Sequence, residues 1–132
     1  DTRQNGLGAD VIKTVRAHGM VDQVVLSSFN PFALRAALLA GREFDAGLLL
    51  APDLPAWTRW DFARRYSRAK GLHPEHKMVD EQYVAGARKS GLPVRVWTVN
   101  EEADMRRMIG LGVDTIITDY PDRLLNVLGV AS

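Results

Sequence analysis

Short apolar runs alternate with amphipathic stretches along this sequence, and this alternation is the strongest constraint on its fold. The apolar runs have the composition of buried strands, and the stretches between them carry apolar residues at helical spacing. This pattern is typical of parallel strands connected by crossover helices. No low-complexity linker interrupts it, so we predict one α/β unit over residues 1–132. The predicted strands are 24–27, 46–51, 72–74, 94–99 and 113–118.

Capping residues indicate where the helices begin. Asn30 precedes Pro31, and Asp80 precedes a second helical pattern. Both side chains suit an N-cap, where an oxygen accepts a free backbone N–H. Glycines are placed to end the helices. The predicted helices are 10–18, 32–40, 56–69, 80–91, 100–110 and 123–128.

Length and charge restrict the class of protein. The 132 residues fit one domain, but a complete eight-stranded α/β barrel needs roughly 250. The formal net charge of +1 and the lack of a basic block argue against a nucleic-acid partner. Basic residues within 59–70 are interleaved with Trp57, Trp60, Phe62 and Tyr66. This interleaving favours a solvated helix face over buried aromatic side chains.

Three features that the sequence lacks further restrict the kinds of site and protein it can represent. There is no cysteine, which excludes disulfides, thiolate metal sites and a cysteine nucleophile and leaves the compartment undetermined. No apolar run approaches the roughly 18 residues of a membrane span. The sequence begins Asp1-Thr2-Arg3, without Met and unlike a signal peptide. We therefore expect that it was processed, trimmed or cut from a longer protein.

Functional groups of parallel α/β folds collect where strands end and helices begin, because those loops share one face of the sheet. Helix N-termini at that face add free N–H groups and positive potential, which suit an anionic substrate. The predicted strand ends are 27–30, 51–53, 72–75, 97–100 and 118–121.

Three of these segments resemble the glycerophosphodiester phosphodiesterase family. They are 27–29 (Ser-Ser-Phe), 96–100 (Val-Trp-Thr-Val-Asn) and 112–121, and their order and spacing match as well. Residues 72–74 resemble the family more weakly. The resemblance covers about residues 11–128 and implies the C-terminal half of a TIM (βα)8 barrel. It also implies hydrolysis of glycerophosphodiesters to glycerol 3-phosphate and an alcohol, with calcium or magnesium as the divalent cation.

The catalytic half of the family pattern has no counterpart in this sequence. The family's His-Arg-Gly motif, its Glu and Asp metal ligands, its second His and its Glu-x-Lys strand all precede the segments resembled here. Glu75-His76-Lys77 follows a proline and does not match the Glu-x-Lys position. We therefore expect no catalytic residue and no metal ligand in this chain, and a catalytic N-terminal half outside it.

Phe29 and Trp97 match family positions at the mouth of the active site. An aromatic face there would shield the glycerol carbons from water, so the resemblance implies that both residues bind substrate. Barrel core is the other interpretation of both residues, because an aromatic on a buried strand commonly packs inside.

Asn100 and Asp119 lie at two of the strand ends. Either side chain could orient a substrate hydroxyl or a metal-bound water, but both stand where a helix N-cap is needed. We expect capping. Asp119 alone does not make a metal site, since hard cations need several converging oxygen ligands.

The histidines and serines offer no clear catalytic pair. His18 precedes Gly19 at a helix end, where the helix dipole explains it. His76 is expected at the surface, and His73, near a strand end, is expected to be structural. Ser27 and Ser28 lack the surroundings of a nucleophile.

Two hypotheses remain open at the level of sequence. In the first, the chain is part of a phosphodiesterase whose catalytic half is missing, and its partner is a glycerophosphodiester. In the second, it is a catalytically silent half-barrel that binds a partner or itself. Half a barrel leaves strand edges unpaired, so we expect self-association or pairing with the missing half in either case.

Overall fold

The computed structural model describes residues 6–54 and 61–130, and the chain divides into two compact units. Unit 1 is Asp1–Gly71 and unit 2 is Leu72–Ser132. The predicted start of the helix 56–69, with Trp57 and Trp60, lies outside the described residues, as does the Asp1-Thr2-Arg3 start. Each unit alternates parallel strands with helices, as the sequence pattern predicted.

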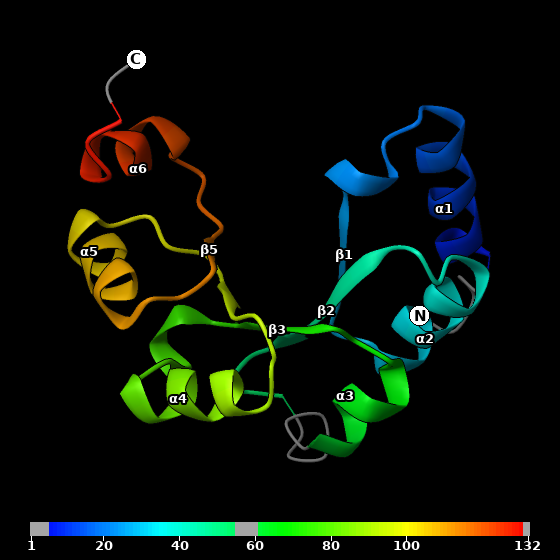
Figure 1. The fold of residues 1–132 in the computed structure, drawn as a ribbon, viewed down its shortest axis with the longest axis horizontal. Helices are drawn as coiled ribbons and strands as arrows, with labels where there is room; N and C mark the ends of the chain where they lie inside the picture. The colour runs from blue at the N-terminus through cyan, green and yellow to red at the C-terminus, as the bar shows by residue number, and fades with distance from the viewer. Residues whose placement is uncertain (1–5, 55–60, 131–132) are drawn as a thin grey trace. The chain divides into compact units, whose positions relative to one another are not determined.

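Unit 1 is a parallel strand pair with helices before, between and after the strands (Figure 1). β1 pairs with β2 in parallel, from Val25 opposite Asp45 to Ser28 opposite Leu48. The helix α2 makes the crossover between them and packs beside α1. The elements are α1 (Leu7–Ala17), η1 (Val21–Gln23), β1 (Val25–Ser28), α2 (Pro31–Ala40), β2 (Asp45–Leu50) and α3 (Asp61–Ser67).

Local signals fix the ends of α1 and α2. The Asn30 side chain accepts from the backbone N–H of Phe32 at 2.9 Å and of Ala33 at 3.3 Å, and Pro31 occupies the first turn. The predicted N-cap is therefore confirmed. His18 is the C-cap of α1, in agreement with its predicted place at the helix end.

The core of unit 1 closes tightly around Gly41. Ile12, Phe44 and Leu48 are all buried. A Cβ atom at Gly41 would lie 2.6 Å from Ile12 Cδ1 and 2.8 Å from Phe44 Cδ2. Glycine is therefore required where α2 ends, because any side chain would displace this packing.

The basic helix of unit 1 differs from the prediction in one respect. Arg64 and Arg65 lie in its last turn, as expected of a solvated face. Phe62, however, is 67% exposed, so the prediction that it lies buried beneath that face is wrong. Its ring stacks on Tyr66, which also carries the Arg35 guanidinium 4.9 Å above its ring centre.

Unit 2 repeats the alternation with shorter strands. β4 and β5 pair in parallel, Arg95 opposite Thr115 and Val96 opposite Ile116. Single parallel bridges join Leu72 to Val94 and Glu75 to Trp97. The elements are β3 (Gly71–Pro74, whose first residue belongs to unit 1), η3 (His76–Met78), α4 (Glu81–Lys89), β4 (Arg95–Val96), α5 (Glu102–Leu111), β5 (Thr115–Ile116) and α6 (Pro121–Val127).

The helices of unit 2 cover one continuous apolar core. The Asp80 side chain accepts from the backbone N–H of Tyr83 at 2.8 Å, which confirms the predicted cap of α4. Within this unit α5 packs beside α6 (Figure 1). The buried cluster comprises Val79, Val84, Ala87, Val94, Val96, Val99, Met105 and Met108.

Candidate functional site

Trp97 stands directly after β4, where the strand gives way to a loop. Its indole Nε1–H donates to the backbone carbonyl of His73 at 2.6 Å. Its backbone N–H donates to Pro74 at 3.2 Å, and its carbonyl accepts from the His76 N–H at 2.9 Å. Three hydrogen bonds, two to β3 and one to the first residue of η3, thus fix both the backbone and the ring edge of Trp97, and the residue remains partly exposed.

His73 itself is almost completely buried, with 1% of its surface exposed. Its Nε2 lies 3.3 Å from Nη1 of Arg95. A guanidinium group can only donate, so Nε2 is the acceptor of this hydrogen bond. The arrangement suits the predicted structural role, because a buried ring held in this way has little access to a substrate.

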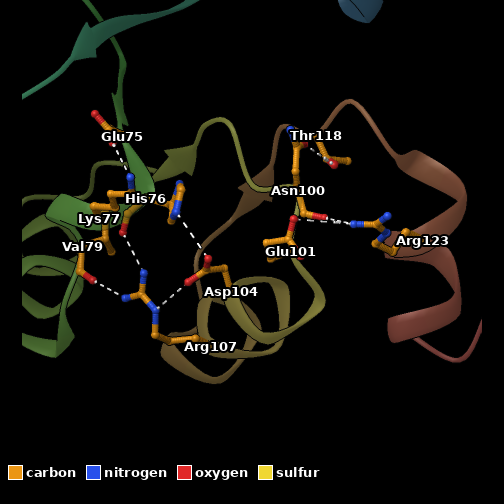
Figure 2. A network of polar contacts seen from close by, with 10 residues as sticks. All are labelled: Glu75, His76, Lys77, Val79, Asn100, Glu101, Asp104, Arg107, Thr118 and Arg123. Atoms are coloured by element: carbon orange, nitrogen blue, oxygen red, sulfur yellow. Dashed lines mark hydrogen bonds and ion pairs between the residues drawn. The ribbon is translucent and has the colours of Figure 1, made fainter.

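Asn100 joins the loop after β4 to the loop after β5 (Figure 2). Its Oδ1 accepts from the Asp119 N–H at 3.0 Å and from the Thr118 hydroxyl at 3.2 Å. Its Nδ2 donates to Asp119 Oδ2 at 2.9 Å. The backbone donor at Asp119 fixes which end of the amide is oxygen.

The capping roles predicted for Asn100 and Asp119 are wrong. The N-cap of α5 is Glu101 and that of α6 is Tyr120, and neither cap position makes a side-chain capping hydrogen bond. Each helix begins one residue later than a cap at Asn100 or Asp119 would need. The two polar side chains instead face each other across neighbouring loops, a long-range pairing that local sequence patterns do not contain.

Arg123 lies in α6 and contacts the loop after β4 (Figure 2). Its Nη1 donates to the backbone carbonyl of Asn100 at 2.6 Å and lies 4.0 Å from a carboxylate oxygen of Glu101. The same guanidinium lies 4.5 Å above the ring centre of Tyr120. Arg123 therefore holds the loop after β4 against α6, and Asn100 joins the same loop to the loop after β5. Sequence reasoning missed Arg123 because it carried no motif.

A second polar network holds the segment after β3 against α5 (Figure 2). Arg107 donates to the carbonyls of Val79 and His76 at 3.0 and 3.1 Å and lies 3.5 Å from Asp104. His76 Nε2 lies 3.6 Å from the same carboxylate group. His76 is only 8% exposed. The prediction that it lies at the surface is wrong, because η3 folds it beneath α5.

The sequence of the chain matches a known family over most of its length. Residues 2–123 match the family model described as the glycerophosphoryl diester phosphodiesterase family. The chain belongs to this family. The resemblance seen in the strand-end motifs is thereby confirmed.

Curated relatives and solved structures agree with this assignment. The chain is 35% identical over 123 residues to a glycerophosphodiester phosphodiesterase of Caldanaerobacter subterraneus subsp. tengcongensis, covering 93% of this chain and 49% of that protein. It resembles a putative glycerophosphoryl diester phosphodiesterase from Silicibacter pomeroyi DSS-3 with a TM-score of 0.85 and 31% identity, covering 96% of this chain and 44% of that chain.

A third comparison adds a ligand. An Oleispira antarctica phosphodiesterase in complex with the product sn-glycerol-3-phosphate matches with a TM-score of 0.68 and 27% identity, over 80% of this chain and 41% of that chain. The chain thus spans about half the length of the relatives it matches. The predicted fold class, parallel strands with crossover helices resembling half of a TIM barrel, is confirmed.

Phe29, the other predicted substrate residue, lies in unit 1 immediately after β1. It is 43% exposed, so it does not belong to the core of this unit. The next residue, Asn30, caps α2 and also donates its backbone N–H to the Ser28 hydroxyl at 3.1 Å. Phe29 is therefore presented at a strand end next to a well-fixed turn.

A groove of about 530 Å³ in unit 1 was not foreseen from the sequence. It lies between α1, β1 and α2, and Leu7, Val11 and Phe32 are exposed members of its lining. The apolar residues of α1 were recognised in the sequence as one face of a helix, but the sequence did not show that this face lines a groove. Ser27 and Ser28 line the same groove.

The described residues do not fit a divalent cation by themselves. Among residues 6–54 and 61–130, no group of three or more His, Cys, Asp or Glu side chains is placed to hold a metal. Asp119 shares its site with an amide, whereas a hard cation needs several oxygen ligands. Over the same residues no helix is long and apolar enough to cross a membrane.

Proposed function

We propose that the chain is the C-terminal, substrate-side half of a glycerophosphodiester phosphodiesterase barrel. In the whole enzyme, water attacks the phosphorus atom and the bond to the alcohol oxygen breaks. The products are sn-glycerol 3-phosphate and the free alcohol. A divalent cation, calcium or magnesium, and the residues that hold it belong to an N-terminal half, because the described residues here supply no such set.

The observation that carries this proposal is the fixed position of Trp97. Its indole N–H is committed to the His73 carbonyl at 2.6 Å, so the ring cannot rotate freely and its partly exposed surface has a set direction. A preset aromatic face suits the carbon atoms of a small polyol, because it removes them from water without ordering a mobile side chain on binding. Phe29 is a second candidate for the same role in unit 1.

The ligand of the Oleispira antarctica relative supports the choice of substrate. That phosphodiesterase holds the product sn-glycerol-3-phosphate, and it matches 80% of this chain. A glycerophosphodiester contains the same glycerol phosphate part. We therefore assign glycerol recognition to the residues of this chain and the reaction at phosphorus to the other half.

A direct test joins the two halves. The first half of the Caldanaerobacter relative, fused to this chain, would give a complete barrel, referred to below as the fused barrel. We expect it to release glycerol 3-phosphate from glycerophosphocholine or glycerophosphoethanolamine, and to lose activity with EDTA. Each half alone should be inactive. A folded but inactive fused barrel, shown by a cooperative unfolding transition, would argue against the assignment.

A silent, self-associating half-barrel is the second candidate, and the groove of unit 1 favours it. Leu7 and Phe32 line this groove and are 53% and 58% exposed. Exposed apolar surface of this kind is common at sites of association. Activity of the fused barrel separates this candidate from the first, because a silent module would contribute nothing to turnover.

A further inference from the structure

Asp119 carries a carboxylate that the fold orients but does not neutralise. Asn100 Nδ2 donates to its Oδ2 at 2.9 Å, while the residue as a whole stays exposed. Among the described residues no Lys, Arg or His lies within ion-pair distance of it; the guanidinium of Arg123 is 4.0 Å from Glu101 and donates to the Asn100 carbonyl instead. Among the described residues, Oδ1 of this exposed side chain has no hydrogen-bond or ion-pair partner.

The neighbouring polar groups of the two loops are already occupied. The Thr118 hydroxyl donates to Asn100 Oδ1 and accepts from the Tyr120 N–H at 3.0 Å. Asn100 Oδ1 accepts two hydrogen bonds. With Thr118 and Asn100 occupied in this way, Asp119 Oδ1 is an acceptor that remains available to a ligand.

Asp119 lies at the same end of the β4–β5 pair as Trp97. β4 and β5 are paired in parallel, so the loops after them lie on the same side of the sheet. Trp97 directly follows β4, and Asp119 lies in the loop after β5. An aromatic face together with a hydrogen-bond acceptor is a combination suited to a polyol, which has carbon atoms and hydroxyl donors.

Charge decides which part of a glycerophosphodiester can meet Asp119. A carboxylate without a cation repels a phosphate, which also carries negative charge. It accepts strongly from a neutral hydroxyl, because hydrogen bonds to an ionised acceptor are about twice as strong as neutral ones. The phosphate end is therefore excluded and the hydroxyl end is favoured.

We propose that Asp119 accepts a hydrogen bond from a glycerol hydroxyl of the substrate, and that Asn100 is the positioning residue that orients it. This deepens the proposed function and rests on it. Asn100 acts by donating to one carboxylate oxygen and accepting from the Asp119 backbone, which holds the second oxygen in a set direction. The hydroxyl donor keeps its proton, so no covalent step is involved.

Exchanging the two side chains separates position from charge. N100D places two carboxylates together and removes the donor. N100D/D119N restores one amide-to-carboxylate hydrogen bond with donor and acceptor exchanged, and position 100 still accepts from Thr118 and the residue 119 N–H. We expect urea unfolding of the chain to show a loss of stability for N100D and recovery for the double variant. N30D is the matched control, because Asn30 only accepts and a carboxylate does the same.

Steady-state kinetics of the fused barrel then test the proposed hydrogen bond between Asp119 and the substrate hydroxyl. We expect D119N and the double variant to raise KM on the order of tenfold, the size expected for weakening a hydrogen bond to a charged group, with kcat little changed. D80N is the control, because Asp80 caps α4 through one acceptor oxygen that Asn retains. An unchanged KM for D119N in an active fused barrel overturns the assignment while leaving the proposed function intact.

A titration of the chain itself covers the case of an inactive fused barrel. Glycerol should shift the NMR signals of Asp119 and Tyr120, inorganic phosphate should not, and D119N should abolish the glycerol response. Such a result supports the hydroxyl contact even if hydrolysis fails. Absence of a glycerol response, together with an inactive fused barrel, overturns the assignment along with the proposed function.

Discussion

The indole N–H of Trp97 donates to the backbone carbonyl of His73 across 2.6 Å, and His73 is almost completely buried. The contact ties the residue after β4 to the middle of β3. The hydrogen bond sets the orientation of an aromatic side chain that is partly exposed. Its two properties, the hydrogen bond at the ring edge and the area of the ring face, can be removed separately.

Trp97→Phe removes the hydrogen bond and keeps an aromatic face. The hydrogen bond to the His73 carbonyl is lost, and a typical intramolecular hydrogen bond contributes about 0.5–1.5 kcal/mol to stability. We expect urea unfolding of the chain to show a loss in this range. No loss of stability would indicate that the 2.6 Å contact contributes nothing to the fold.

Gly112 should tolerate substitution less well than Gly91. Both have positive φ, +71° and +65°, so alanine is strained at either position by about 1–2 kcal/mol. At Gly91 a Cβ would meet open space, whereas at Gly112 it would meet the Arg88 guanidinium, which donates to the Gly112 carbonyl at 2.8 Å. We expect chemical denaturation to show a larger loss for Gly112→Ala than for Gly91→Ala. The excess should disappear in an Arg88→Ala background, and an excess that persists there would contradict this explanation.

Burial raises the pKa of the Tyr83 hydroxyl to about 12. Because the folded pKa lies above the ordinary value of 10.0, the neutral phenol stabilises the fold fully below about pH 10, and this contribution falls as the pH rises toward 12. The hydroxyl has no hydrogen-bond partner among the described residues. Tyr83→Phe should therefore be neutral or mildly stabilising at pH 7 and should flatten the loss of stability above pH 10.

Thermal unfolding of wild type and Tyr83→Phe between pH 8 and pH 12, in steps of about one pH unit, makes the comparison. Equal slopes for wild type and Tyr83→Phe would show that Tyr83 ionises as readily folded as unfolded.

The isolated chain should associate at working concentrations. β1 pairs with β2 along one edge, and among the described residues of unit 1 no strand covers its other edge. The groove beside it exposes Leu7, Val11 and Phe32. Light scattering over a dilution series should show species larger than the 14.6 kDa monomer, and Val11→Lys should lower their fraction. A monodisperse monomer whose unfolding does not depend on concentration would contradict this expectation.

Local interactions were the part of this fold that could be read from the sequence. The caps at Asn30 and Asp80 bond to backbone groups two or three residues away, so a short motif contains all of each interaction. Asn100 and Asp119 looked the same in sequence, yet they bond to each other across a separation of 19 residues. Only the pairing of β4 with β5 brings them together.

Strand lengths show the same limit. The apolar run 94–99 predicted a longer strand than β4, which covers only Arg95–Val96. Val99 lies beyond the end of β4 and donates its N–H to the Ile117 carbonyl at 2.9 Å. Its side chain is buried, so the position needs an apolar residue although it is not part of the strand. Burial and strand pairing both select β-branched residues, and the sequence alone does not separate them.

Trp97→Ala in the fused barrel shows whether Trp97 shields bound glycerol, with unfolding and steady-state kinetics measured on one preparation. If the ring shields bound glycerol, kcat/KM per folded molecule should fall more than tenfold, a loss above about 1.4 kcal/mol of transition-state stabilisation. Trp97→Phe keeps an aromatic face but loses the hydrogen bond that fixes it, so its kcat/KM should lie between the values of wild type and Trp97→Ala. A loss of roughly 3–5 kcal/mol in folding stability with unchanged kcat/KM would make Trp97 a packing residue and rule out its role in glycerol binding.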